Sequence, residues 1–179
     1  KREDDPREAR ELGINVFGRV EAYDISNTQG QEPVASGVVF VEGVPRKSLY
    51  KKFKIKTVKG ANDIAMMKEA LSRRFAHAQA GESGETWKLP DLLVIDGGRG
   101  QVNAAMEVLR GLHLKIPTIG LAKGPDRKQD VVVYGDRTPE LVRAVTRYKK
   151  ILQHVRDEAH RFAVSYHRFR RGKKFLAKG

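Results

Sequence analysis

The sequence predicts an α/β fold: a mixed β-sheet, made of an antiparallel three-strand meander followed by βαβ units, with helices on its faces. Two observations carry this prediction. Apolar residues alternate with polar ones in the first third of the chain, and later they recur at helical spacing or in short continuous runs. A meander followed by crossover connections builds one sheet flanked by helices.

The first part of the chain is expected to form the meander. Residues 1–15 are mostly charged and are expected to be a solvated lead-in segment, before a folded domain over residues 16–179. Alternation then predicts strands at 18–25, 33–42 and 47–56. In the first of these strands, Val20, Ala22 and Asp24 fall on one face.

The second part changes to helical spacing. A helix is predicted from about Asn62 to Ala80, with Asn62 or Asp63 as its N-cap. The apolar run 92–95 predicts a strand buried on both faces, and a helix follows Gly97–Gly100. The remaining predicted elements are a strand at 116–121, a short strand at 131–134 and a final helix from about 145 to 167. The ribonuclease-H-like fold has this order of elements.

Positive charge is concentrated at the end of the chain. The 179 residues include 35 Lys and Arg against 22 Asp and Glu, a formal net charge of +13. Residues 137–179 hold 13 basic and 3 acidic residues, so +10 of this charge lies in the last quarter. Such a patch favours a polyanion, because each neutralised phosphate releases condensed counterions. Nucleic acid is the expected partner, and a solvated surface or an anionic membrane is the alternative.

Composition excludes several classes of protein. Without cysteine the chain can form neither disulfides nor a cysteine-ligated zinc site, which agrees with a cytoplasmic location. No apolar run approaches the ~20 residues that span a bilayer, and the charged residues 1–11 are unlike a signal peptide. A globular domain without a membrane partner is expected. Nothing in the sequence predicts a dimer, so a monomer is expected.

Two aspartates end strands that are expected to be neighbours. Asp24 closes the first predicted strand, and Asp96 closes the apolar run before Gly97 and Gly98. If the two strands are parallel neighbours, both carboxylates lie at the carboxyl edge of the sheet, where open α/β sheets place their sites. Two close carboxylates repel unless a cation lies between them, and Mg²⁺ or Mn²⁺ prefers such oxygen ligands. Each aspartate alone is also explained as a turn or cap residue.

The final predicted helix carries a histidine beside its apolar stripe. At ~100° per residue, one flank of the stripe holds Lys149, Gln153, Arg156, His160 and His167. Glu158 falls on the opposite flank. His160 can therefore meet the carboxylate pair, whereas Glu158 needs a local distortion to do so. A packing or hydrogen-bonding role is the alternative for His160.

Two further segments are candidates for phosphate contacts. The backbone N–H groups of residues 98–101 open a helix just beyond Asp96, which is a position where helices bind anions. The segment is neither a GxGxxG nor a Walker A loop, so it favours nucleotide binding only weakly. Lys123 follows a predicted strand and can reach a phosphate, and a solvated turn lysine is the alternative.

Five stretches of the chain match the motifs of one known family: EAYDISNTQG, VASGVVF, LLVIDGGRGQVNAA, IGLAKGPDRK and RDEAHRFAVSYHRFRR. Together they resemble the C-terminal endonuclease domain of UvrC, which makes incisions in bacterial nucleotide excision repair. The resemblance implies a ribonuclease-H-like fold, divalent metal and incision on the 5′ side of a lesion. It also implies a longer protein, because the family's N-terminal nuclease module, UvrB-contacting segment and helix-hairpin-helix module are not among these residues.

When the family's functional residues are matched one by one to this sequence, the resemblance implies an Asp-Asp-His triad like that of Argonaute nucleases. Asp24 matches the family's YDIS-type segment, Asp96 its IDGG segment and His160 its RDEAHRF segment. The triad is expected to be catalytic and to hold two Mg²⁺ or Mn²⁺ ions. Asp63 and Glu158 are expected to support it. An N-cap role alone also explains Asp63.

The expected substrate is damaged double-stranded DNA, bound in the full-length protein as a complex with UvrB. Basic side chains are expected to hold the strand by its phosphates without reading its sequence. These side chains are Arg99, Lys123, Arg156, Arg161, His167, Arg168, Arg170 and Arg171. Two other functions fit the same residues: a non-catalytic nucleic-acid-binding domain of this fold, and a nuclease that cuts RNA or RNA–DNA hybrids.

Overall fold

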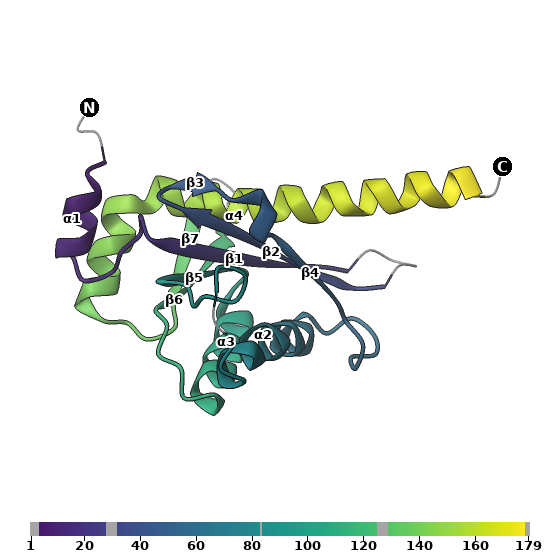
Figure 1. Cartoon of the computed structure of the whole chain (residues 1–179), viewed down its shortest axis with the longest axis horizontal. Helices are drawn as coiled ribbons and strands as arrows, with labels where there is room; N and C mark the ends of the chain where they lie inside the picture. The colour runs from purple at the N-terminus through teal and green to yellow at the C-terminus, as the bar shows by residue number, and fades with distance from the viewer. Residues whose placement is uncertain (1–3, 28–31, 83, 125–128, 178–179) are drawn as a thin grey trace.

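In the part of the chain that the structure describes, seven strands form one mixed sheet between two layers of helices (Figure 1). The structure is a computed structural model. It describes residues 4–27, 32–82, 84–124 and 129–177, and for residues 166–177 it describes the backbone alone. The strands are β1 (Arg19–Ser26), β2 (Val34–Val41), β3 (Val44–Pro45), β4 (Lys51–Lys54), β5 (Leu92–Asp96), β6 (Thr118–Lys123) and β7 (Asp130–Tyr134).

The strand order confirms the predicted meander and the βαβ units that follow it. The sheet runs β3-β2-β1-β5-β6-β7, and β4 pairs with β2 as well. β2 is antiparallel to β1 and β4, whereas β5 is parallel to both β1 and β6. The final strand, β7, is antiparallel to β6. The first strand of the meander therefore lies directly beside the first strand of the βαβ part.

Helices cover both faces of the sheet and create two hydrophobic cores. On one face lie α2 (Asp63–Gln79) and α3 (Arg99–Gly111), and on the other lie α1 (Pro6–Glu11) and α4 (Pro139–Ala177) (Figure 1). Side chains of a strand alternate between the two faces. Val20 and Ala22 accordingly pack toward α4, whereas Tyr23 packs toward α2.

The final helix is longer than its apolar pattern predicts. It begins six residues earlier, at Pro139, where the hydroxyl of Thr138 accepts a hydrogen bond from the Leu141 N–H at 3.2 Å. The backbone at Tyr148 is non-helical, with φ −115° and ψ 27°, so the helix is kinked there. The buried Tyr148 ring packs edge-on against Phe17 at 5.4 Å. Beyond the kink, α4 runs along the sheet and continues past it to Ala177 (Figure 1).

Two other segments differ from the predictions. The third strand of the meander is shorter than expected, because a 3-10 helix, η1 (Lys47–Leu49), precedes β4. In the expected lead-in segment, Ala9 and Ile14 are buried in the core on the α4 face. Part of this segment is therefore packed and not solvated throughout. The domain boundary at residue 15 stays a prediction.

A buried ionic network joins β1 to α2. Both oxygens of the fully buried Glu21 carboxylate accept hydrogen bonds from Arg74, at 2.9 and 2.8 Å. Arg19 donates to the same carboxylate at 2.9 Å, and the hydroxyl of Tyr23 donates at 2.8 Å. Burial raises the pKa of Glu21, but the hydrogen bond and charge of Arg74 outweigh it and lower the pKa overall.

None of the helices that the structure describes is long and apolar enough to cross a membrane.

Candidate metal centre

The two candidate aspartates lie side by side at the carboxyl edge of the sheet. In the parallel pair of β1 and β5, Tyr23 is opposite Ile95, and Asp24 and Asp96 are the next residues of the two strands. Asp24 points to the same face as Val20 and Ala22, which is the face that α4 covers. The parallel pairing of two buried strands thus brings together two carboxylates that are 72 residues apart in the chain.

The third residue of the candidate metal centre, His160, comes from α4. The His160 Nδ1 atom lies 3.1 Å from Oδ2 of Asp24 and 3.9 Å from Oδ2 of Asp96. Each of the three residues offers one possible ligand atom, and these three atoms all lie within 4.8 Å of one another. Asp24 is only 8% exposed, whereas the His160 side chain is 66% exposed. The cluster is therefore buried at Asp24 and open to solvent at His160.

The electrostatics of the cluster favour a cation. The pKa of Asp24 is raised to about 6, because burial and the negative charge of Asp96 raise it by more than His160 lowers it. Burial also raises the pKa of Asp96, and the charges of Arg156 and His160 offset this only in part. Negative charge at this edge of the sheet is thus incompletely compensated by the protein.

The donor atoms fit a divalent metal ion. Carboxylate oxygens suit hard cations such as Mg²⁺ and Mn²⁺, and a neutral imidazole nitrogen is a common ligand of transition metals. A cation between Asp24 and Asp96 would relieve the repulsion that raises the pKa of Asp24. The open side of the cluster at His160 leaves room for a substrate group.

The two expected supporting acids lie in different surroundings. Asp63 is the exposed first residue of α2, and its charge raises the pKa of Asp24, so it contributes to the negative field. The N-cap is Asn62, whose side chain accepts from the Ala65 N–H at 3.0 Å, so capping does not explain Asp63. Glu158 accepts hydrogen bonds from Tyr50 and Arg161 on the opposite flank of α4. The structure does not bring Glu158 to the cluster.

Arg156 is expected from the sequence to contact DNA, but in the structure it forms ion pairs within the protein. Its guanidinium is buried and donates to both oxygens of Asp130, at 3.1 and 2.9 Å, and to Asp157 at 2.7 Å. A buried guanidinium needs carboxylate partners, and a bidentate pair satisfies it. Arg156 therefore fastens α4 to the start of β7. No sequence pattern indicated Asp130 as its partner, because the two residues meet only in the folded chain.

The other expected DNA contacts are distributed along this edge and along α4. Lys123 is exposed, and its charge acts on Asp96, so it lies near the cluster. Arg99 is exposed and donates to the carbonyl of Tyr134 at 2.6 Å, and Arg161 pairs with Glu158. The side chains of His167, Arg168, Arg170 and Arg171 lie outside the described residues, and α4 carries their backbone.

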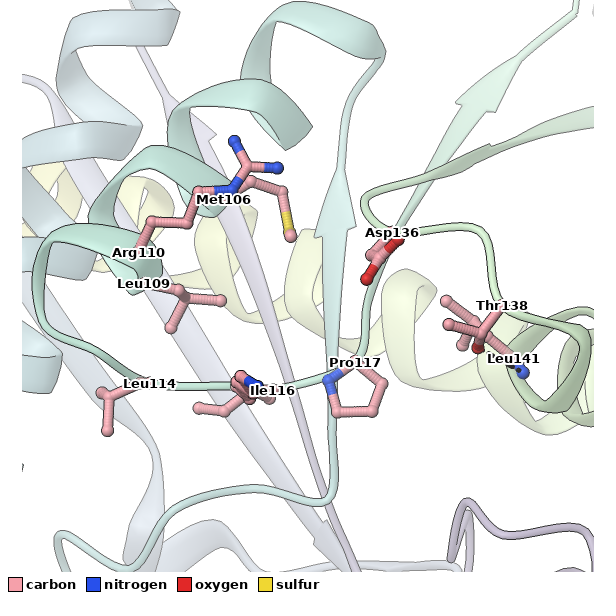
Figure 2. A pocket seen from close by; sticks show the side chains of 10 residues that line it. Met106, Leu109, Arg110, Leu114, Ile116, Pro117, Asp136, Thr138 and Leu141 are labelled. Atoms are coloured by element: carbon pink, nitrogen blue, oxygen red, sulfur yellow. Dashed lines mark hydrogen bonds between the residues drawn. The ribbon is translucent and has the colours of Figure 1, made fainter.

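A separate pocket of about 370 Å³ lies at the opposite edge of the sheet. Figure 2 shows Met106, Leu109, Leu114 and Ile116 along one side of it, and Asp136 on the other. These residues belong to the end of α3 and to the segments that flank β6 and β7. None of the three cluster residues lines it, so it is distinct from the candidate metal centre.

The sheet order and this site define the class of protein. An antiparallel meander joined to parallel βαβ strands, with a carboxylate pair at the carboxyl edge and a histidine from the last helix, is a ribonuclease-H-like nuclease domain. The chain belongs to the UvrC RNAse H endonuclease domain family, which it matches over residues 9–164. The family resemblance and the predicted ribonuclease-H-like fold are thereby confirmed.

Named relatives agree with this family. The UvrABC system protein C of Methanococcoides burtonii is 51% identical over 154 residues, which are 85% of this chain and 24% of that protein. The UvrABC system protein C of Clostridium novyi is 43% identical over 172 residues, which are 90% of this chain and 28% of that protein. The chain thus spans about a quarter of the length of the curated relatives it matches.

A solved structure shows the same fold. The catalytic domain of human endonuclease V is similar with a TM-score of 0.55 and 15% sequence identity. The similarity covers 94% of this chain and 90% of that one, so it includes the sheet and the helices on both of its faces.

Proposed function

We propose that this domain nicks DNA by metal-dependent hydrolysis of a phosphodiester, and that it makes the 5′ incision of bacterial nucleotide excision repair. The observation that carries this proposal is the cluster of Asp24, Asp96 and His160 at the carboxyl edge of the sheet. Membership of the UvrC endonuclease domain family supports it. The product is a nick with 5′ phosphate and 3′ hydroxyl ends.

Each member of the cluster has a separate task in this function. Asp24, Asp96 and His160 would together hold two Mg²⁺ or Mn²⁺ ions, with oxygen ligands from the two aspartates and a nitrogen ligand from the histidine. When bound, the metals lower the pKa of the attacking water and stabilise the leaving 3′ oxygen. Burial keeps Asp24 in place, and the exposed His160 side chain lies where the strand approaches. Lys123, close to Asp96, adds positive charge for the phosphate.

The proposed substrate is damaged duplex DNA, and the proposed partner of the full-length protein is a UvrB–DNA complex. The names of the relatives support these assignments, since both are UvrABC system proteins. The net charge of +13 supports a polyanionic substrate. A monomeric state and a cytoplasmic location complete the proposal.

The basic end of α4 provides a test of the DNA contact. Replacing Arg168, Arg170 and Arg171 together by alanine should weaken duplex binding and reduce the slope of log K against log salt by up to about 3, because each lost phosphate contact removes ~0.9. Fluorescence anisotropy over a range of salt concentrations measures this slope. An unchanged slope would show that other residues hold the phosphates.

A further inference from the structure

A cleft of about 780 Å³ lies beside the kink of α4, away from the metal centre. It is bounded by the helix around Tyr148, by the start of β7 and by the N-terminal segment at Asp4. Figure 1 shows that α4 changes direction here, before the straight part that passes the sheet. Among the side chains that line the cleft are two polar ones and two positively charged ones: Thr146, Gln153, Lys149 and Lys150.

The charge that this cleft presents is positive. Its two carboxylates are engaged: Asp4 pairs with Arg147 at 3.0 Å, and Asp130 pairs with Arg156 at 2.9 Å. Among the residues that the structure describes, no carboxylate lies within ion-pair distance of Lys149 or Lys150. Two ammonium groups beside an open, polar cleft are suited to an anion such as a phosphate.

The cleft and the metal centre lie on one flank of the same helix. Lys149, Gln153, Arg156 and His160 recur at spacings of four, three and four residues, which keeps them on one side of a helix. Gln153 and Arg156 both contact Asp130 on this flank, and His160 contacts Asp24. At 1.5 Å per residue, Lys149 lies about 16 Å along the helix from His160.

One strand of DNA is long enough to reach both places at once. One strand of B-DNA carries a phosphate for every ~3.4 Å of helix axis, so about 16 Å corresponds to about five nucleotides. A strand with its scissile phosphate at the metal centre can thus place another phosphate at the cleft. The helix itself sets the distance between the two places, and the buried pair of Arg156 and Asp130 fastens this part of α4 to the start of β7, which bounds the cleft.

We propose that the cleft at Lys149 and Lys150 is a second phosphate-binding site, which holds the nicked strand about five nucleotides to one side of the cut. The proposal rests on the proposed function, in that it takes the cut strand to lie along α4. The site recognises the DNA backbone and not its sequence. Arg156 then holds α4 against β7 and does not itself bind the strand.

The first experiment measures binding by the 179-residue chain. Replacing Lys149 and Lys150 together by alanine should reduce the salt slope of duplex binding by up to about 2. The matched control is Arg110→Ala with Lys115→Ala, which removes the same charge beside the pocket at the opposite edge of the sheet (Figure 2). That control should leave the slope unchanged. Equal effects of the two double variants, or no effect of the first, would overturn the proposal.

The second experiment locates the contact. Single uncharged methylphosphonate linkages are placed at successive positions along the cut strand, and incision is measured with the intact protein and its partners. A linkage about five nucleotides from the cut should slow incision several-fold, and the Lys149/Lys150 variant should lose this sensitivity. If the Lys149/Lys150 variant and the parent protein respond in the same way to every linkage position, the cleft does not bind a phosphate of the cut strand. If the intact protein makes no incision, the proposed function fails. The salt slope of the 179-residue chain still shows whether the cleft binds phosphate.

Discussion

Replacing His160 by alanine is expected to lower the rate of 5′ incision by at least about a hundredfold, while the domain keeps its fold. Loss of a residue that only orients a metal ligand costs roughly 10–100-fold, so loss of a ligand should cost more. The fold should survive because the side chain is largely exposed and lies beside the apolar stripe of α4. The rate is measured with damaged duplex and the intact protein, and folding by thermal melting of the domain.

Glu158→Gln is the matched control, since Glu158 lies on the same helix two residues away. Its carboxylate binds Tyr50 and Arg161 and does not reach the cluster, so incision should change much less than in His160→Ala. His160→Asp should retain part of the activity, because a carboxylate oxygen also suits Mg²⁺ or Mn²⁺. Normal incision by His160→Ala together with an inactive Glu158→Gln would refute the triad.

The largest effect on stability is expected at Glu21, away from the metal centre. Glu21→Gln should lower the free energy of unfolding by about 3–5 kcal/mol, because it leaves the buried guanidinium groups of Arg19 and Arg74 without their carboxylate. In a domain of this size, the melting temperature should fall by roughly 10 °C. Calorimetry or circular dichroism measures this change.

Glu107→Gln serves as the comparison for Glu21→Gln. Glu107 also forms an ion pair, with Lys68 at 2.7 Å, but its side chain is 67% exposed. Exposed pairs contribute about 0–1 kcal/mol, so this variant should melt within a few degrees of the parent chain. If the two variants lose the same stability, the Glu21 network does not hold β1 against α2.

The importance of Glu21 was not visible in the sequence. Alternation in the first strand places Val20, Ala22 and Asp24 on one face and leaves Glu21 on the other. Helices cover both faces of the sheet, so the second face is a core as well, and Glu21 and Tyr23 lie in it. The partner Arg74 is 53 residues away in the chain. No local pattern can predict such a pair.

The order of elements was predictable because the period of apolar residues changes where the meander ends. The start of α4 was not, since Tyr148 interrupts the helix and packs on Phe17, which no spacing rule indicates. Asp96 ends β5 as predicted, whereas β1 continues past Asp24 to Ser26, where it still pairs with β2. The closeness of the two carboxylates required β1 and β5 to be parallel neighbours. The sequence predicts Arg156 as a DNA contact and cannot indicate its ion pair, because the partner Asp130 comes from another element.

Diffraction from crystals soaked in Mn²⁺ shows whether Asp24, Asp96 and His160 hold divalent metal. Anomalous density should appear between the carboxylates of Asp24 and Asp96, within reach of His160, and it should be lost in Asp24→Asn. Anomalous peaks at other places, with both carboxylates bonded only to protein groups, would show that the cluster of Asp24, Asp96 and His160 is not a metal site.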